Sequence, residues 1–216
     1  MSAEFVAAME DVLDLYAEPY DPQRPVVCFD EVPTQLIAET RRPVPAKPGQ
    51  PERYDYEYQR NGTCNQFMFV EPAVGWRHVV VTDQRTQVDF ANQMKWLSDQ
   101  SHPQAKRIRV VLDNLNTHRP ASLYEVFPPA EARRILKRLE FHYTPKHGSW
   151  LNMAEIEISV FGRPCWDRRI GDKATLVRET QALEAERNAA KATIDWQFTA
   201  DRARERLKRL YPCNSA

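Results

Sequence analysis

The stretch that most constrains the fold of this chain runs from Arg109 to His118, with the sequence RVVLDNLNTH. An apolar run with two β-branched valines predicts a buried strand, and this run stops at Asp113. A carboxylate at the edge of a core is costly unless it caps or binds something. A second run, PVVCFDE at residues 25–31, repeats the pattern and reaches its acid at Asp30. The chain is therefore expected to build a sheet with aspartates at two strand ends.

A third acid, Glu155, lies in a segment with helical periodicity, WLNMAE at residues 150–155. Carboxylate oxygens are the hard ligands that Mg²⁺ prefers, so the three acids are able to share a divalent cation. Glu157 competes with Glu155, but residues two apart on a helix point about 200° apart, so only one can face the aspartates. Asn152, Glu155 and Ser159 share a polar strip, which favours Glu155 and leaves Glu157 as a salt-bridging surface residue.

Composition limits the class of protein. The 216 residues suit one large domain or two small ones, and 42% hydrophobic with 28% charged residues is ordinary for a globular protein. The net charge is zero, with 30 basic and 30 acidic residues, whereas dedicated nucleic-acid modules are usually basic. No apolar run approaches the ~18 residues of a membrane span, and the N-terminus lacks the basic start of a signal peptide. A cytoplasmic protein with no membrane partner is expected.

Periodicity and turn signals divide the chain into elements. A helix is expected at 2–17, followed by a strand through 31 and a basic proline-rich loop beside the first acid at 40–51. A strand with alternating tyrosines is expected at 54–58, a hairpin turn at Asn61-Gly62 and a returning strand at 63–70. Strands at 76–82, 108–113 and 140–144 and helices at 86–100, 130–139, 150–161, 172–190 and 199–210 follow, the first of these helices opening with a Thr86–Asp89 capping box. This order predicts an α/β fold, a mixed sheet of about five strands flanked by helices, with ligands beyond the strand ends.

Three blocks of sequence carry a family resemblance, at residues 29–31 (FDE), 112–118 (LDNLNTH) and 143–155 (YTP followed by SWLNMAE). They resemble the catalytic blocks of bacterial insertion-sequence transposases of the mariner-like superfamily. The resemblance covers roughly Val26 to Leu176. It implies a ribonuclease H-like DDE endonuclease domain, integrase-like in its catalytic core, that cleaves and transfers DNA strands during transposition.

Carried over position by position, the resemblance makes Asp30, Asp113 and Glu155 the catalytic and metal-binding triad. It implies two Mg²⁺ ions, with Mn²⁺ as a substitute, bridged by Asp30 and completed on either side by the other two acids. A gap of 41 residues separates Asp113 from Glu155, which is longer than usual in this superfamily, and the extra length is expected at Ala121–Pro129. Met153 stands where the family often has proline.

DNA, as transposon ends and as target, is the implied partner, and a homodimer is the possible assembly. The residues expected to contact DNA are Arg41 and Arg42 in the basic loop and His118, Lys146 and His147 beside the second and third acids.

The expected division is an N-terminal helix and linker at 1–24, the catalytic domain at 25–190 and a helical tail at 191–216. The family carries upstream helix-turn-helix modules that recognise the element's ends. The roughly 25 residues before the first strand cannot house such a module, so a catalytic domain without its end-recognition part is expected. Two alternatives stay open: an inactive remnant that binds DNA or a full-length partner, and a structure-specific nuclease that cuts without joining.

Overall fold

The computed structural model describes residues 3–41, 44–51, 53 and 55–212. Its centre is a five-stranded mixed sheet with the strand order β3-β2-β1-β4-β5. The strands are β1 (Val26–Glu39), β2 (Tyr58–Glu71), β3 (Trp76–Thr82), β4 (Ile108–Leu112) and β5 (Leu139–Tyr143). β2 is antiparallel to β1 and to β3, whereas β4 is parallel to β1 and to β5. The predicted mixed sheet of about five strands is confirmed.

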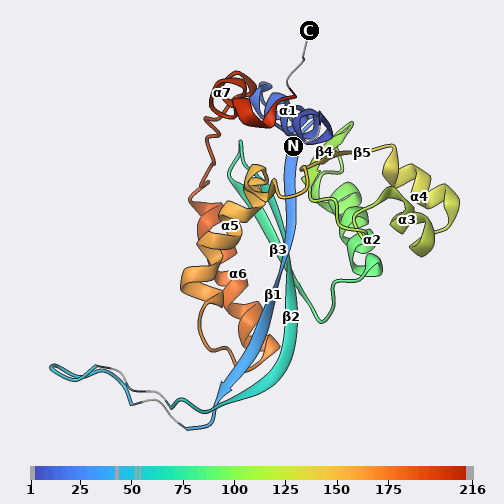
Figure 1. The fold of residues 1–216 in the computed structure, drawn as a ribbon. Coiled ribbons are helices and arrows are strands. Elements are labelled where there is room, and N and C mark those ends of the chain that lie inside the picture. Colours follow the sequence, from blue (N-terminus) through green and yellow to red (C-terminus); the bar gives the residue numbers. More distant parts are fainter. Residues whose placement is uncertain (1–2, 42–43, 52, 54, 213–216) are drawn as a thin grey trace.

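Helices cover both faces of the sheet (Figure 1). One face carries α1 (Ala3–Ala17), α5 (Met153–Phe161), α6 (Lys173–Ala189) and α7 (Ala200–Arg206). The other carries α2 (Gln87–Trp96), α3 (Pro120–Val126) and α4 (Pro129–Leu136). The predicted capping box opens α2, and α3 fills the segment where extra length was expected. None of the helices within the described ranges is long and apolar enough to span a bilayer.

Side chains of β1 alternate between two cores, because successive strand residues point to opposite faces. Cys28 packs in the core under α1 and α5, whereas Val27 and Phe29 pack in the core under α2. The same alternation sends Asp30 to the α5 face and Glu31 to the α2 face. One strand thus delivers adjacent carboxylates to two different environments.

β2 passes through Asn61 and Gly62 without turning, so the predicted hairpin at these residues is wrong. The register shifts where residues 35–37 of β1 face residues 60–63 of β2, which is a β-bulge. Gly62 has φ +94°, a backbone conformation that costs glycine little, and Asn61 Nδ2 donates to the carbonyl of Gly171 at 2.8 Å. An Asn-Gly pair provides the positive φ of a bulge as readily as that of a turn.

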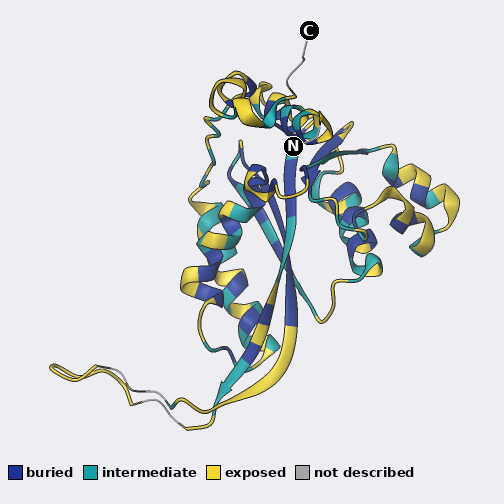
Figure 2. Ribbon diagram, viewed as in Figure 1, coloured by how far each residue is buried: buried dark blue, intermediate teal, exposed yellow. Residues whose placement is uncertain are grey.

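The described residues between Glu39 and Tyr58 extend from the far ends of β1 and β2 as an exposed arm (Figures 1 and 2). A backbone bridge pairs Val44 with Arg53 across it. Glu39 lies nine residue steps of extended strand beyond Asp30, which is about 30 Å. The prediction that this loop lies beside the first acid is therefore wrong.

Helix α6 protects the outer edge of β3. Glu184 accepts a hydrogen bond from Val79 N at 2.8 Å, and the side-chain amide of Asn188 bonds both the N–H and the carbonyl of Arg77, at 2.9 and 2.8 Å. An unpaired strand edge is a template for pairing with other chains. These side chains occupy part of that edge and fix α6 against the sheet.

Candidate active site

Asp30 and Asp113 stand beside each other on neighbouring parallel strands. Cys28 of β1 pairs with Val111 of β4, and each aspartate lies two residues further along its own chain. Two residues preserve the face of a strand, and neighbouring strands are about 4.8 Å apart. The structure therefore brings these two predicted acids together, with Asp30 inside β1 and Asp113 directly after the carboxyl end of β4. Because β1 continues to Glu39, the prediction that Asp30 ends a strand is wrong.

Asn152 anchors the helix that carries Glu155. As the N-cap of α5 its side chain accepts from Ala154 N at 3.1 Å, and its Nδ2 donates to the carbonyl of Phe29 at 2.8 Å and to Asp30 Oδ2 at 3.2 Å. The first turn of α5, with Glu155 in it, is thereby tied to β1 at Asp30. Sequence reasoning saw Asn152 only as part of a polar strip, because nothing in the sequence shows which strand its amide meets.

Asp30 occupies a strongly negative environment. Burial raises the pKa of its carboxyl, the backbone N–H of Glu31, which donates to Oδ1 at 2.8 Å, lowers it, and the charges of Glu155 and Asp113 raise it; together they place the pKa at about 7. Ionising this group therefore costs free energy unless a positive charge comes close. A cation bound here relieves that cost.

His118 does not lie where a DNA-contacting residue must lie. Its side chain is 1% exposed, Nδ1 meets Asp113 Oδ1 at 2.5 Å, and Nε2 meets Glu31 Oε2 at 2.8 Å. Burial lowers the pKa of the imidazole, but the two carboxylates outweigh burial and raise it to about 9. For Asp113, burial raises the pKa of the carboxyl, but the hydrogen bond with His118 outweighs burial and leaves that pKa below its usual value. Neither ring nitrogen is free for a phosphate, so the role predicted for His118 is corrected.

Lys146 and His147 are exposed in the loop between β5 and α5. The loop begins beside the acids, because Thr144 N donates to the carbonyl of Leu112 at 2.9 Å, and Leu112 directly precedes Asp113. The two residues therefore lie on the loop that leaves the sheet beside Asp113.

Arg41 lies at the base of the arm, 78% exposed and paired with Asp55 at 3.3 Å, remote from the acids along β1. Arg42 lies outside the described residues. Two exposed arginines that sequence reasoning missed lie nearer to the acids than Arg41 does. Arg85 pairs with Glu31 at 3.7 Å and helps to lower the pKa of Asp113. Arg119 directly follows His118. Isolated arginines in loops give no pattern by which to find them.

Glu157 belongs to a different cluster. Its side chain is fully buried, with Arg77 donating at 3.3 Å and Arg187 donating to both carboxylate oxygens, at 2.5 and 2.8 Å. The predicted salt bridge exists, but it lies in the core and not on the surface. With both oxygens bound by arginines, Glu157 has none to offer a metal, and the geometry favours Glu155 as the third acid.

The donor chemistry of the acids fits a hard divalent cation. Among the described residues, no three His, Cys, Asp or Glu side chains form a ready-made metal site. Mg²⁺ does not need one, since it usually keeps several waters and binds one or two carboxylates together with substrate phosphates. The placement of Asp30 and Asp113 beside each other in the sheet, and the raised pKa of Asp30, match that mode of binding.

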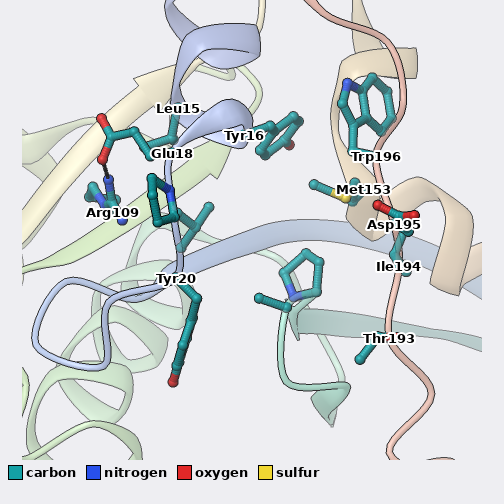
Figure 3. A pocket seen from close by; sticks show the side chains of 14 residues that line it. Leu15, Tyr16, Glu18, Tyr20, Arg109, Met153, Thr193, Ile194, Asp195 and Trp196 are labelled. Carbon is teal, nitrogen blue, oxygen red and sulfur yellow. Dashed lines mark hydrogen bonds and ion pairs between the residues drawn. The ribbon is translucent and has the colours of Figure 1, made fainter.

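A separate pocket of about 470 Å³ lies at the opposite end of the same strands (Figure 3). It is lined by Val26 and Arg109 at the starts of β1 and β4, by Tyr16 and Tyr20, and by Trp196 on the chain after α6. Arg109 forms an ion pair there with Glu18. Its position at the amino ends of the strands separates it from the acids, so this pocket is not part of the candidate site.

A mixed sheet in this order, with adjacent acids on two central parallel strands, one inside β1 and one directly after β4, and a third acid on a covering helix, defines the ribonuclease H-like class of nucleic-acid enzymes. The family model described as DDE superfamily endonuclease matches residues 25–177. The chain belongs to this family.

Solved structures of Mos1 transposase share the fold. A Mos1 strand transfer complex is 12% identical with a TM-score of 0.59, covering 98% of this chain and 62% of that one. A Mos1 paired-end complex with the left transposon end is 13% identical with a TM-score of 0.58, covering 89% and 59%. A Mos1 mariner paired-end complex with Mn is 13% identical with a TM-score of 0.56, covering 89% and 59%. The predicted ribonuclease H-like fold is confirmed.

The chain spans about three fifths of the length of these Mos1 chains. No curated protein matches it.

Proposed function

We propose that this chain is a transposase catalytic domain that cuts DNA strands and transfers them to new sites. One observation carries the proposal: two aspartates 83 residues apart in the sequence end beside each other, on the face where α5 presents Glu155. Membership of the DDE endonuclease family supports it. The Mos1 chains with the same fold were solved in complexes with transposon ends and after strand transfer, which supports DNA as the substrate.

Asp30, Asp113 and Glu155 are the residues that would hold Mg²⁺ or Mn²⁺. Bound divalent ions supply an activated oxygen nucleophile and stabilise the leaving oxygen of a phosphodiester. The Mos1 paired-end complexes include one with Mn and one with Mg, which supports this choice of ions. The chain's own contribution is to hold the acids: Asn152 fixes Asp30 against α5, and the backbone N–H of Glu31 fixes the other oxygen of Asp30.

Lys146 and His147 are proposed to bind the DNA backbone. With a net charge of zero, the chain attracts DNA only through local cations, and these two are exposed on the loop beside Asp113. A phosphate contact releases counterions, so Lys146→Gln is expected to weaken DNA binding and to reduce its salt dependence by about one phosphate contact. Arg41 and Arg42 are proposed as contacts with more distant DNA.

Nicking of supercoiled plasmid in Mg²⁺ or Mn²⁺ tests the proposal, with joined products followed on the same DNA. Asp113→Asn and Asp30→Asn are expected to lower the rate at least about 100-fold, because metal ligands contribute several kcal/mol to the transition state. Asp14→Asn, on the exposed side of α1, is the matched control and retains activity.

Each other outcome points to a different function. Cutting without joining favours the nuclease alternative, and DNA binding without any metal-dependent cutting favours the inactive remnant. Assembly into a homodimer, the possible partner state named from the sequence, stays a prediction that sedimentation with and without DNA tests.

A further inference from the structure

His118 is held more firmly than any role at the surface requires. Its ring packs against Phe29 and Phe90, with ring centroids 5.4 and 4.8 Å away, and its carbonyl accepts from Tyr143 Oη at 2.8 Å. Its two nitrogens meet one carboxylate each, on Asp113 and Glu31. An ionised carboxylate only accepts hydrogen bonds, so donation from both nitrogens requires the doubly protonated ring. The ring is thus held between two acids by both of its nitrogens.

The bond to His118 fixes how Asp113 presents its carboxylate. Asp113 Oδ1 accepts from His118 Nδ1 and from Leu115 N, the latter at 3.3 Å. Among the hydrogen bonds of the described residues, none uses Asp113 Oδ2, and the side chain is 43% exposed. One oxygen is committed to the protein and the other is left for a ligand from outside.

Glu31 keeps His118 in place from the far side of the ring. Its side chain is 4% exposed, and Arg85 approaches the oxygen that His118 does not use, at 3.7 Å. Glu31 points to the α2 face and Asp30 to the α5 face, so two adjacent residues of β1 serve the same site from opposite sides of the sheet. Ligand side chains in metal sites are commonly oriented by such outer partners.

We infer that His118 and Glu31 are positioning residues that orient the Asp113 carboxylate for a divalent cation, an inference that rests on the proposed function. His118 touches neither DNA nor the reacting atoms. It acts through Asp113 by occupying one oxygen and restricting rotation of the carboxylate, so that the second oxygen stays available.

Mn²⁺ affinity of the whole chain, measured by electron paramagnetic resonance without DNA, tests the inference separately from catalysis. His118→Phe, which preserves a ring but removes both hydrogen bonds, is expected to weaken Mn²⁺ binding about 10- to 100-fold. Glu31→Gln preserves shape and is expected to weaken it less, about 3- to 10-fold, because the bond survives without its charge. His142→Phe is the matched control, because His142 also lies between two carboxylates, Asp11 and Glu140, but on the α1 side of β5. This variant is expected to leave the Mn²⁺ affinity unchanged.

A double-mutant cycle shows whether His118 works through Asp113. In an Asp113→Asn background, His118→Phe is expected to weaken Mn²⁺ binding no further, because its only route to the ion is already gone. Additive losses, or a folded His118→Phe variant with wild-type Mn²⁺ affinity, overturn the inference. Should His118→Phe not fold, the isosteric Glu31→Gln decides, and wild-type affinity in that variant overturns it equally.

The proposed function is checked by a different comparison. If wild type and Asp113→Asn bind Mn²⁺ equally weakly, the metal site itself is wrong and both conclusions fall. If wild type binds and Asp113→Asn does not, the site stands and only the His118 and Glu31 variants judge the positioning role. The two failures are therefore distinguishable.

Discussion

Two carboxylates on the same helix, Glu155 and Glu157, have opposite surroundings. Glu157 is buried between Arg77 and Arg187, which neutralise it. Glu155 adds its charge to those of Asp30 and Asp113, where the nearby cation His118 is already shared with Glu31. A carboxylate that the protein neutralises itself serves the fold. A group of carboxylates left negative is prepared for a cation from solution.

The largest expected effect is a loss of folding stability when the cluster of Glu157, Arg77 and Arg187 is disrupted. Glu157→Gln leaves Arg77, whose side chain is fully buried, without its counter-ion, and removing one partner of a buried pair costs about 3–5 kcal/mol. Guanidinium unfolding measures this loss against Glu205→Gln, an exposed change on α7 expected to stay within about 0.5 kcal/mol. A loss below about 1 kcal/mol for Glu157→Gln contradicts the structural role.

Glu155→Gln is expected to have the opposite pattern to Glu157→Gln, with a loss of activity and no loss of stability. It leaves the fold intact but lowers metal-dependent nicking at least about 100-fold, close to 3 kcal/mol in the barrier, because a ligand is lost and no buried ion pair is broken. Plasmid nicking and thermal unfolding are measured on the same preparation. Equal activity in Glu155→Gln and wild type would exclude Glu155 as the third acid.

The stability of the acid cluster is expected to depend on pH in chelator-treated protein. The pKa of Asp30 is about 7 in the folded chain against an ordinary 3.8, so between these values the folded state holds a proton that the unfolded state has lost. Stability therefore falls as pH rises from about 4 to 7, by about 1–3 kcal/mol from this residue. Unfolding of wild type and Asp30→Asn across this range measures the difference, which should grow with pH. A constant difference would mean that the pKa of Asp30 is not raised in the folded chain.

The smallest expected effect concerns the link between the helix and the strand. Asn152→Ala removes the N-cap of α5, which costs about 1 kcal/mol, and also releases Asp30 from its hydrogen bond. Thr199→Ala, at the N-cap of α7, should cost similar stability but leave nicking unchanged. If both variants nick at the wild-type rate, Asn152 is a cap and no more.

The acids could be found from sequence because strand parity and hydrophobic runs are local. PVVCFD and RVVLD each place an aspartate at the same distance along a buried run, and two such runs paired in parallel set their aspartates side by side, although β1 continues past Asp30 to Glu39. The order of strands and helices followed from periodicity in the same way. The resemblance of the three blocks then joined Glu155 to the pair.

What the sequence could not give depends on contacts remote along the chain. Asn61-Gly62 satisfies a turn and a bulge equally, and only the pairing of β2 with β1 decides between them. His118 looks like a loop histidine until Glu31, 87 residues away, is brought against its ring. The sequence suggests an exposed Glu157, because nothing in it shows that Arg77 of β3 and Arg187 of α6 bury and bind this side chain.

The bulge at Gly62 lies between the arm and the acids on the paired strands β1 and β2. Slipping β1 by a single residue past β4 would exchange the faces of Asp30 and Glu31 and put the wrong carboxylate under α5. A bulge absorbs one unmatched residue without passing it further along the ladder. Insertions and deletions in the arm can therefore accumulate at the distal end of β1, while the register that aims Asp30 is inherited unchanged.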